Sequence, residues 1–230
     1  MSTLEAGTTA PVRPRPTPGW TELAFAVLGY LALSVVATLG VLAVQKPPNA
    51  ALAVAAVAVA TFGAVGLALV VRVRSAACLR LRHPGRRWLL AALAVGLGLR
   101  GVVVLIVLAW QHLTGDTTNP QQFLLDGALA GGWTLVGLVV LGGLVVPVAE
   151  ELFFRGVVDS ALRRYGPAVA VLGSGALSGL AHGQSVVLVV AVLLGVVNAV
   201  LVERSGSIWP AVIVHATNNV LAFVAVAVLM

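Results

Sequence analysis

The chain has 230 residues, of which 60% are hydrophobic and only 10% are charged, and its mean hydropathy is +1.04. Because soluble domains hold roughly 25% charged residues, this composition excludes a soluble globular protein. The apolar runs are long and continuous, which excludes a membrane β-barrel with its alternating segments of about ten residues. We therefore expect an all-α, polytopic transmembrane helical bundle with its N-terminus inside.

About seven apolar segments are expected to cross the bilayer after a disordered Pro/Arg tail at residues 1–19. They are 20–44, 50–71, 88–110, 131–155, 168–183, 185–202 and 207–230. The fourth continues as helix to Arg164 and ends at Tyr165-Gly166-Pro167, because glycine caps a helix and proline follows its end. The outer loop 111–130 is expected to contain a short amphipathic or re-entrant piece around 121–129, which would make an eighth inserted segment.

The basic residues fix the predicted orientation. With the N-terminus inside, eleven of the 14 lysines and arginines fall in cytoplasmic segments, as the positive-inside rule requires. Lys46 alone is outside, and Arg100 and Arg155 lie within spans. The net charge of +6 therefore reports topology, and we expect no nucleic-acid partner. Arg100 is expected to pair with an acidic group or to line water, since a lipid-facing arginine at mid-span is unfavourable.

Polar groups interrupt the apolar helices of the second half at four places. These are Glu150/Glu151/Arg155, His182, Asn198, and His215 with Asn218 and Asn219. At 1.5 Å per residue, Glu150 lies about 21 Å from Arg164, His182 about 22 Å from Pro167, and His215 about 16 Å from Arg204. Three helices are thus expected to place ionisable groups in one layer that is reached from the cytoplasmic side.

Spacing along each helix indicates which side chains share a face. Glu151 and Arg155 are four residues apart and are expected to pair, and His215 and Asn219 have the same spacing. Glu150 is turned about 100° from Glu151, so we expect it to face a different cavity. Pro147 removes a backbone donor and is expected to kink the helix just before the two carboxylates.

These residue types suit hydrolysis. A glutamate in an apolar pocket can accept a proton from water that a histidine helps to hold, and a second histidine with an asparagine can donate to an oxyanion. Alternatively, Glu150, His182 and His215 could bind a divalent metal such as zinc that activates the water. No His-Glu-x-x-His pair is present. A third interpretation is a satisfied polar network that only holds helices together, and Asn198 is expected to make such a helix–helix hydrogen bond.

Three short motifs carry a resemblance to a known family. Glu-Glu-Leu-Phe-Phe-Arg-Gly at 150–156 matches the Glu-Glu-x-x-x-Arg signature of the CPBP family (CAAX protease and bacteriocin-processing, also called Abi). The segment 207–219 resembles the last motif, in which Trp-Pro precedes His-x-x-x-Asn. Ala181-His182-Gly183 resembles the middle motif, Phe-x-x-x-His, although Ser178 occupies the phenylalanine position. The resemblance covers about 147–219, roughly a third of the chain.

The resemblance implies an intramembrane endopeptidase, similar to type II CAAX prenyl endopeptidases, in a multi-pass protein of the bacterial plasma membrane. Its helices at 131–230 would be catalytic, and those at 20–130 would complete one membrane domain. Glu150 and His182 would activate water, His215 and Asn219 would stabilise the oxyanion, and Glu151 and Arg155 would support the site. The family is often labelled metalloprotease, so the metal question stays open.

The substrate implied by this resemblance is a peptide or a lipidated protein, cleaved in CAAX-type, peptide-maturation or bacteriocin-related processing. One alternative is a non-enzymatic scaffold or bacteriocin-immunity protein that retains the polar network. Another is a proton-coupled transporter, which the absence of an obvious internal repeat disfavours. The sequence does not indicate the substrate's identity or the oligomeric state.

Overall fold

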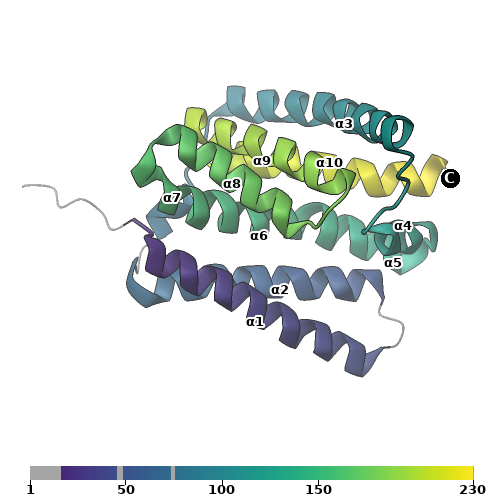
Figure 1. The fold of residues 1–230 in the computed structure, drawn as a ribbon, viewed down its shortest axis with the longest axis horizontal. Coiled ribbons are helices and arrows are strands. Elements are labelled where there is room, and N and C mark those ends of the chain that lie inside the picture. Colours follow the sequence, from purple (N-terminus) through teal and green to yellow (C-terminus); the bar gives the residue numbers. More distant parts are fainter. Residues whose placement is uncertain (1–16, 46–48, 74–75, 230) are drawn as a thin grey trace, which may run out of the picture.

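The computed structural model describes residues 17–45, 49–73 and 76–229, and in these ranges the chain is mainly helical, without strands. The helices run roughly along one common direction and form a bundle (Figure 1). The apolar side chains of α1, such as Leu28, Val36 and Leu39, are exposed on its outer face, where a bilayer would cover them. The predicted fold class, a polytopic helical bundle, is confirmed.

The helices fall close to the predicted spans. They are α1 (Trp20–Val44), α2 (Ala50–Ala68), α3 (Arg86–Thr114), α4 (Gln122–Leu129), α5 (Gly132–Gly137), α6 (Val146–Glu151), α7 (Asp159–Leu162), α8 (Pro167–Ala181), α9 (Val186–Ser205) and α10 (Trp209–Leu229). Shorter pieces are the π-helical η1 (Leu69–Val73), η3 (Leu138–Val145) and η4 (Leu152–Val158), and the 3₁₀ turns η2 (Ala76–Leu79) and η5 (Arg163–Tyr165).

In the described part of the chain, six helical segments are long and apolar enough to cross a membrane. They are Trp20–Val44, Ala50–Val71, Arg86–Thr114, Gly132–Tyr165, Val186–Ser205 and Trp209–Leu229. The predicted fifth span corresponds to α8, which has only 15 residues and falls short of that length. The short piece predicted near 121–129 is the helix α4. Of the predicted tail, residues 1–16 lie outside the described part of the chain.

The segment Gly132–Tyr165 is a continuous helical rod in which the helix type changes around the two glutamates. The π-helical η3 leads into α6, which carries Glu150 and Glu151, and the π-helical η4 follows at once. Pro147 stands in the first turn of α6, where its missing N–H leaves the preceding backbone pattern irregular. Such π-helical stretches are frequent at functional sites, because they re-aim the side chains beside them.

The segments predicted to be cytoplasmic meet at one end of the bundle. The Arg82 Nε donates to the Gly206 carbonyl at 2.6 Å, which ties the start of α3 to the turn between α9 and α10. At the same end the Arg164 guanidinium donates to the Pro18 carbonyl at 3.0 Å, and the Trp20 indole donates to the Tyr165 hydroxyl at 2.8 Å. Helices α1, α3 and α10 therefore begin on the same side of the bundle (Figure 1).

A four-residue ion cluster closes this end. Arg80 contacts Asp159 at 3.0 Å and Glu203 at 3.2 Å, and Arg163 pairs with both carboxylates. The Asp159 side chain is only 1% exposed, whereas that of Glu203 is 18% exposed. The cluster joins the loop before α3 to the fourth and sixth predicted spans.

We predict that Asp159→Asn lowers the free energy of unfolding by about 1–3 kcal/mol, because the buried carboxylate compensates two arginines. Glu203→Gln should cost less, since water solvates the charges it leaves behind. Thermal unfolding of the purified variants in one detergent measures both. Equal losses would contradict the argument from burial, and no loss from Asp159→Asn would show that the cluster does not hold this end together.

Candidate active site

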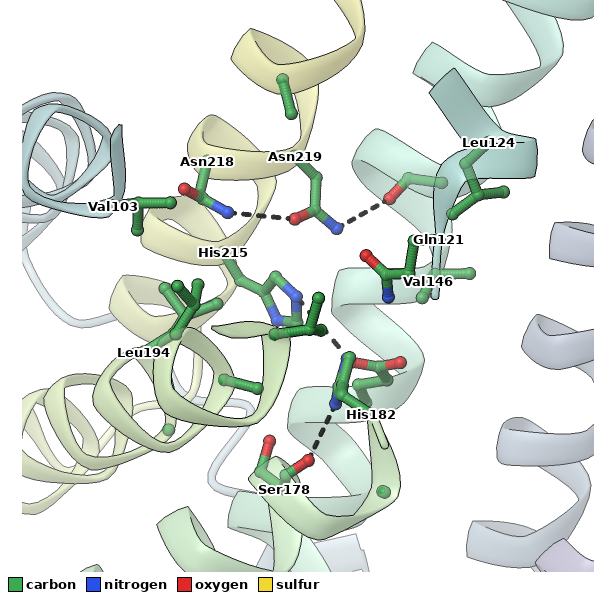
Figure 2. Close-up of a pocket in the computed structure, with 18 of the residues that line it drawn as sticks. Val103, Gln121, Leu124, Val146, Ser178, His182, Leu194, His215, Asn218 and Asn219 are labelled. Atoms are coloured by element: carbon green, nitrogen blue, oxygen red, sulfur yellow. Dashed lines mark hydrogen bonds and ion pairs between the residues drawn. The ribbon is translucent and has the colours of Figure 1, made fainter. Parts of the chain in front are cut away.

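A cavity of about 920 Å³ lies between the helices and is lined by all six predicted site residues: Glu150, Glu151, Arg155, His182, His215 and Asn219. The close-up in Figure 2 shows His182 at the end of α8 and His215 and Asn219 on α10, converging on the same space. Helices that are separate in sequence thus place these groups in one layer, as their spacing from the cytoplasmic segments predicts.

Glu151 is the most heavily engaged side chain of the site, and it is only 1% exposed. Its Oε1 accepts a hydrogen bond from the Asn198 amide at 2.8 Å and lies 2.8 Å from Nδ1 of His215. Its Oε2 lies 3.2 Å from Nε of Arg155, which is the predicted pair at a spacing of four residues. Glu151 therefore connects three elements, η4, α9 and α10.

The Arg155 side chain, which pairs with Glu151, is also only 1% exposed and therefore lies in the interior of the bundle. Its Nη2 donates to the Gly195 carbonyl of α9 at 2.7 Å. Glycines make this contact possible: a Cβ atom added to Gly195 would lie 2.8 Å from the Gly175 Cα of α8. Close approach of membrane helices through small residues thus places a backbone acceptor beside a buried guanidinium.

His215 lies between the two glutamates. Its Nδ1 faces Glu151, and its Nε2 lies 3.8 Å from Oε2 of Glu150. Because a carboxylate can only accept, the proton belongs on Nδ1, which leaves Nε2 directed at Glu150. The two neighbouring carboxylates therefore line one cavity, and the expectation that Glu150 faces a different one is wrong. Glu151 faces Nδ1 of the His215 ring, whereas Glu150 faces Nε2 of the same ring.

Glu150 makes no close hydrogen bond through Oε2, although this atom is buried. The oxygen lies 3.6 Å from Nε2 of His182 and 3.8 Å from Nε2 of His215. Both separations exceed a direct hydrogen bond, and buried carboxylate oxygens normally have a partner. This is the arrangement expected where a carboxylate and two imidazoles share a small third molecule.

His182 is oriented by the backbone. Its Nδ1 lies 2.8 Å from the Ser178 carbonyl, which accepts the Nδ1 proton and leaves Nε2 facing Glu150. Since the contact uses the main chain, the serine at the family's phenylalanine position does not disturb it. Gly183 follows with a φ of 93°, which ends α8 directly after the histidine.

Asn219 and Asn218 form a short chain of amides on α10. The Asn218 amide donates to Oδ1 of Asn219 at 3.4 Å, and the Asn219 amide donates to the Gly142 carbonyl at 3.1 Å (Figure 2). The Gly142 acceptor lies in the π-helical η3. These contacts fix the rotamer of Asn219 while its amide group remains in the lining of the cavity.

Glu150, His182 and His215 are the residues that could hold a metal ion. They converge, but as placed no group of three or more histidine, cysteine, aspartate or glutamate side chains among the described residues is arranged to hold one.

Further polar side chains line the cavity, among them Asn198, Gln121 and Arg100. Asn198 makes the predicted helix–helix hydrogen bond, and its acceptor is Glu151, which makes it part of the site. Gln121, at the start of α4, points into the cavity beside His182 and His215 (Figure 2), and nothing in its sequence context singled it out. Arg100 of α3 also lines the cavity. The predicted acidic partner of Arg100 is not found among the described residues.

Comparison with known proteins supports the family resemblance. Residues 132–221 match the family model described as "Type II CAAX prenyl endopeptidase Rce1-like". The match runs from α5 into α10, contains all six predicted site residues, and confirms the resemblance seen in the motifs. No curated protein and no solved structure matches the chain significantly.

The geometry predicts that neutralising Glu151 and neutralising Glu150 change the free energy of unfolding by very different amounts. Glu151→Gln should lower the free energy of unfolding by about 3–5 kcal/mol, because it leaves the buried Arg155 charge uncompensated. Glu150→Gln should cost little or even stabilise, since it neutralises a buried oxygen that lacks a partner.

Thermal and denaturant unfolding of both variants in the same detergent provides the comparison. A loss from Glu150→Gln as large as that from Glu151→Gln would mean that Glu150 is also a structural residue.

Proposed function

We propose that this multi-pass membrane protein, Rce1-like over residues 132–221, is an intramembrane endopeptidase in which Glu150 activates the attacking water. One observation carries the proposal: Oε2 of Glu150 is buried without a hydrogen-bond partner and faces Nε2 of both His182 and His215 inside the cavity. Ionisable side chains within membrane helices are functional groups by default.

In the first step, a water between Glu150 and the two imidazoles would donate one proton to the Glu150 carboxylate. The acceptor nitrogens of His182 and His215 orient the water, because each has its Nδ1 proton already committed to another partner. The oxygen then attacks the carbonyl carbon of the scissile peptide bond. General-base help of this kind contributes about 10²–10⁴-fold to the rate.

In the second step, the tetrahedral intermediate would be stabilised and resolved. The proton on Glu150 can reach Nε2 of His215, 3.8 Å away, through the oxygen of the intermediate that lies between them, and Glu151 at Nδ1 stabilises the resulting imidazolium. The imidazolium and the Asn219 amide donate to the oxyanion. The C–N bond breaks and the leaving nitrogen takes the His215 proton. The new carboxylic acid then gives its proton to the amine, so the products are a carboxylate and an ammonium group.

Glu151, Arg155 and Asn198 would act by positioning. They contact His215 or one another and hold the ring so that one nitrogen points to Glu150. A carboxylate behind a catalytic histidine fixes its tautomer and supports its charged form, as in other hydrolases.

The substrate is proposed to be a peptide or a lipidated protein of a bacterial plasma membrane. Much of the cavity wall is apolar, with Val27, Leu31 and Val57 from α1 and α2 and Phe123 from α4. Such a wall suits an apolar chain beside a peptide, and the polar layer lies about 21 Å from the basic end at Arg164. CAAX-type cleavage of a lipidated C-terminal segment fits this arrangement.

The test uses purified protein and a fluorogenic farnesylated CAAX peptide. We expect Glu150→Gln and His215→Ala to lower kcat by about 10²–10⁴-fold, because each removes a group that handles the transferred proton. Asp126→Asn, an exposed carboxylate on α4, is the matched control and should retain activity. No cleavage by folded wild-type protein of this peptide or of a membrane-peptide library would favour the scaffold or immunity function.

A second prediction concerns metal ions. Since the donor set does not form a metal centre, activity should survive dialysis against 1,10-phenanthroline and EDTA. The rate before and after dialysis, and after zinc is added back, is the measurement. Loss of activity that zinc restores would show that Glu150, His182 and His215 rearrange to bind a metal.

A further inference from the structure

The guanidinium of Arg100 is a cation in the cavity wall that has no protein anion. Arg100 is the fifteenth residue of α3, is half-buried and lines the cavity. Among the residues that the structure describes, none forms an ion pair or hydrogen bond with its side chain, although Arg100 is in the middle of a predicted span. Because a charge at that depth is costly, it calls for a partner that the described residues do not supply.

The carboxylates that share the cavity are engaged elsewhere. Glu151 is shared by Arg155, Asn198 and His215, and Asp116 accepts hydrogen bonds from the Trp110 indole and from Thr118. Glu150 faces the two histidines. The anion that fits Arg100 must therefore arrive with the ligand.

The register of α3 against α10 gives the offset along the bundle axis between Arg100 and the reacting centre. Both helices begin at the same end, and a Cβ added to Gly96 would lie 2.9 Å from the Thr217 Cβ. Arg100 is four residues, or about 6 Å, beyond this contact, and His215 is two residues, or about 3 Å, before it. The axial offset between Arg100 and His215 is therefore about 9 Å, since the side chains of both parallel helices lean back in the same direction.

The depth of Arg100 and its axial offset from His215 limit the kind of anion that can bind to it. Arg100 lies about 21 Å along α3 from Arg86, deep in the apolar layer and away from lipid headgroups. An extended peptide advances about 3.3–3.6 Å per residue, so an axial offset of about 9 Å corresponds to about three residues of a peptide that lies along the bundle axis. Every peptide with a free C-terminus carries an anion there, the terminal carboxylate, and a guanidinium binds a carboxylate with two parallel hydrogen bonds.

We propose that Arg100 binds the free C-terminal carboxylate of the substrate and so directs cleavage to a bond within about three residues of the C-terminus. This assignment rests on the proposed function, and it adds a specificity-determining residue from α3, outside the segment that matches the family model. Val103, one turn further along α3, lines the cavity together with Asn218 of α10 (Figure 2), so this face of α3 is turned towards the site.

The test compares two dansylated, farnesylated peptides that differ only in ending as a carboxylate or a carboxamide. Wild-type protein should cleave the acid with a kcat/KM about tenfold or more above that for the amide, mainly through KM. Arg100→Gln should abolish this preference. Arg87→Gln, an exposed arginine at the start of the same helix, is the matched control and should keep the wild-type preference.

The outcomes separate this proposal from the proposed function. Equal cleavage of acid and amide by the wild type overturns the Arg100 assignment and leaves the protease intact. An Arg100→Gln variant that is folded but keeps the acid preference also overturns it. If the wild type cleaves neither peptide, the protease proposal fails, and fluorescence anisotropy with the same two peptides still decides whether Arg100 confers tighter binding of the acid.

Discussion

The buried contact set of Glu151 is the constraint on which the rest of the site depends. A carboxylate and a guanidinium, each only 1% exposed, lie 3.2 Å apart, and the same carboxylate accepts from Asn198 and holds His215. Leaving either charge alone in an apolar interior is expensive, so each holds the other in place. Because the partners come from three elements, the pair also fixes how η4, α9 and α10 meet.

Because Glu151 is held in this way, the adjacent Glu150 lies in a different environment. One residue of helical rotation takes Glu150 to the opposite nitrogen of His215, where its Oε2 has no hydrogen-bond partner. The two glutamates are neighbours in sequence, and the fold pairs Glu151 with Arg155, Asn198 and His215, whereas Oε2 of Glu150 faces only the two imidazoles at more than 3.5 Å. A carboxylate held by an arginine supports a site, whereas one beside two imidazoles can accept a proton.

Much of this arrangement can be predicted from the sequence, because a small number of physical rules governs membrane helices. Length and hydropathy locate the spans, and a rise of 1.5 Å per residue predicts that Glu150, His182 and His215 share one layer. The Glu151–Arg155 pair follows from a spacing of four residues. The predicted fifth span, 168–183, is the shortest of the seven, and the helix α8 is shorter still, with 15 residues.

What the sequence could not predict depends on lateral packing. Rotation of each helix about its axis decides that Glu150 and Glu151 share one cavity, and no periodicity in these uniformly apolar segments specifies it. The π-helical stretches around α6 and the backbone acceptors at Ser178, Gly142 and Gly195 are likewise set by tertiary contacts. Gln121 reaches the cavity only because α4 folds back against α10, which polar loop residues do not reveal.

The most direct test of Glu150 as a base follows the oxygen atom. In a single turnover with excess enzyme in ¹⁸O-labelled water, a general base delivers one ¹⁸O atom to the new carboxylate of the cleaved peptide, which mass spectrometry detects. We predict this labelled product and an unlabelled Glu150. An unlabelled peptide product with ¹⁸O in the Glu150 side chain would show that the glutamate attacks the substrate itself, and would contradict the account.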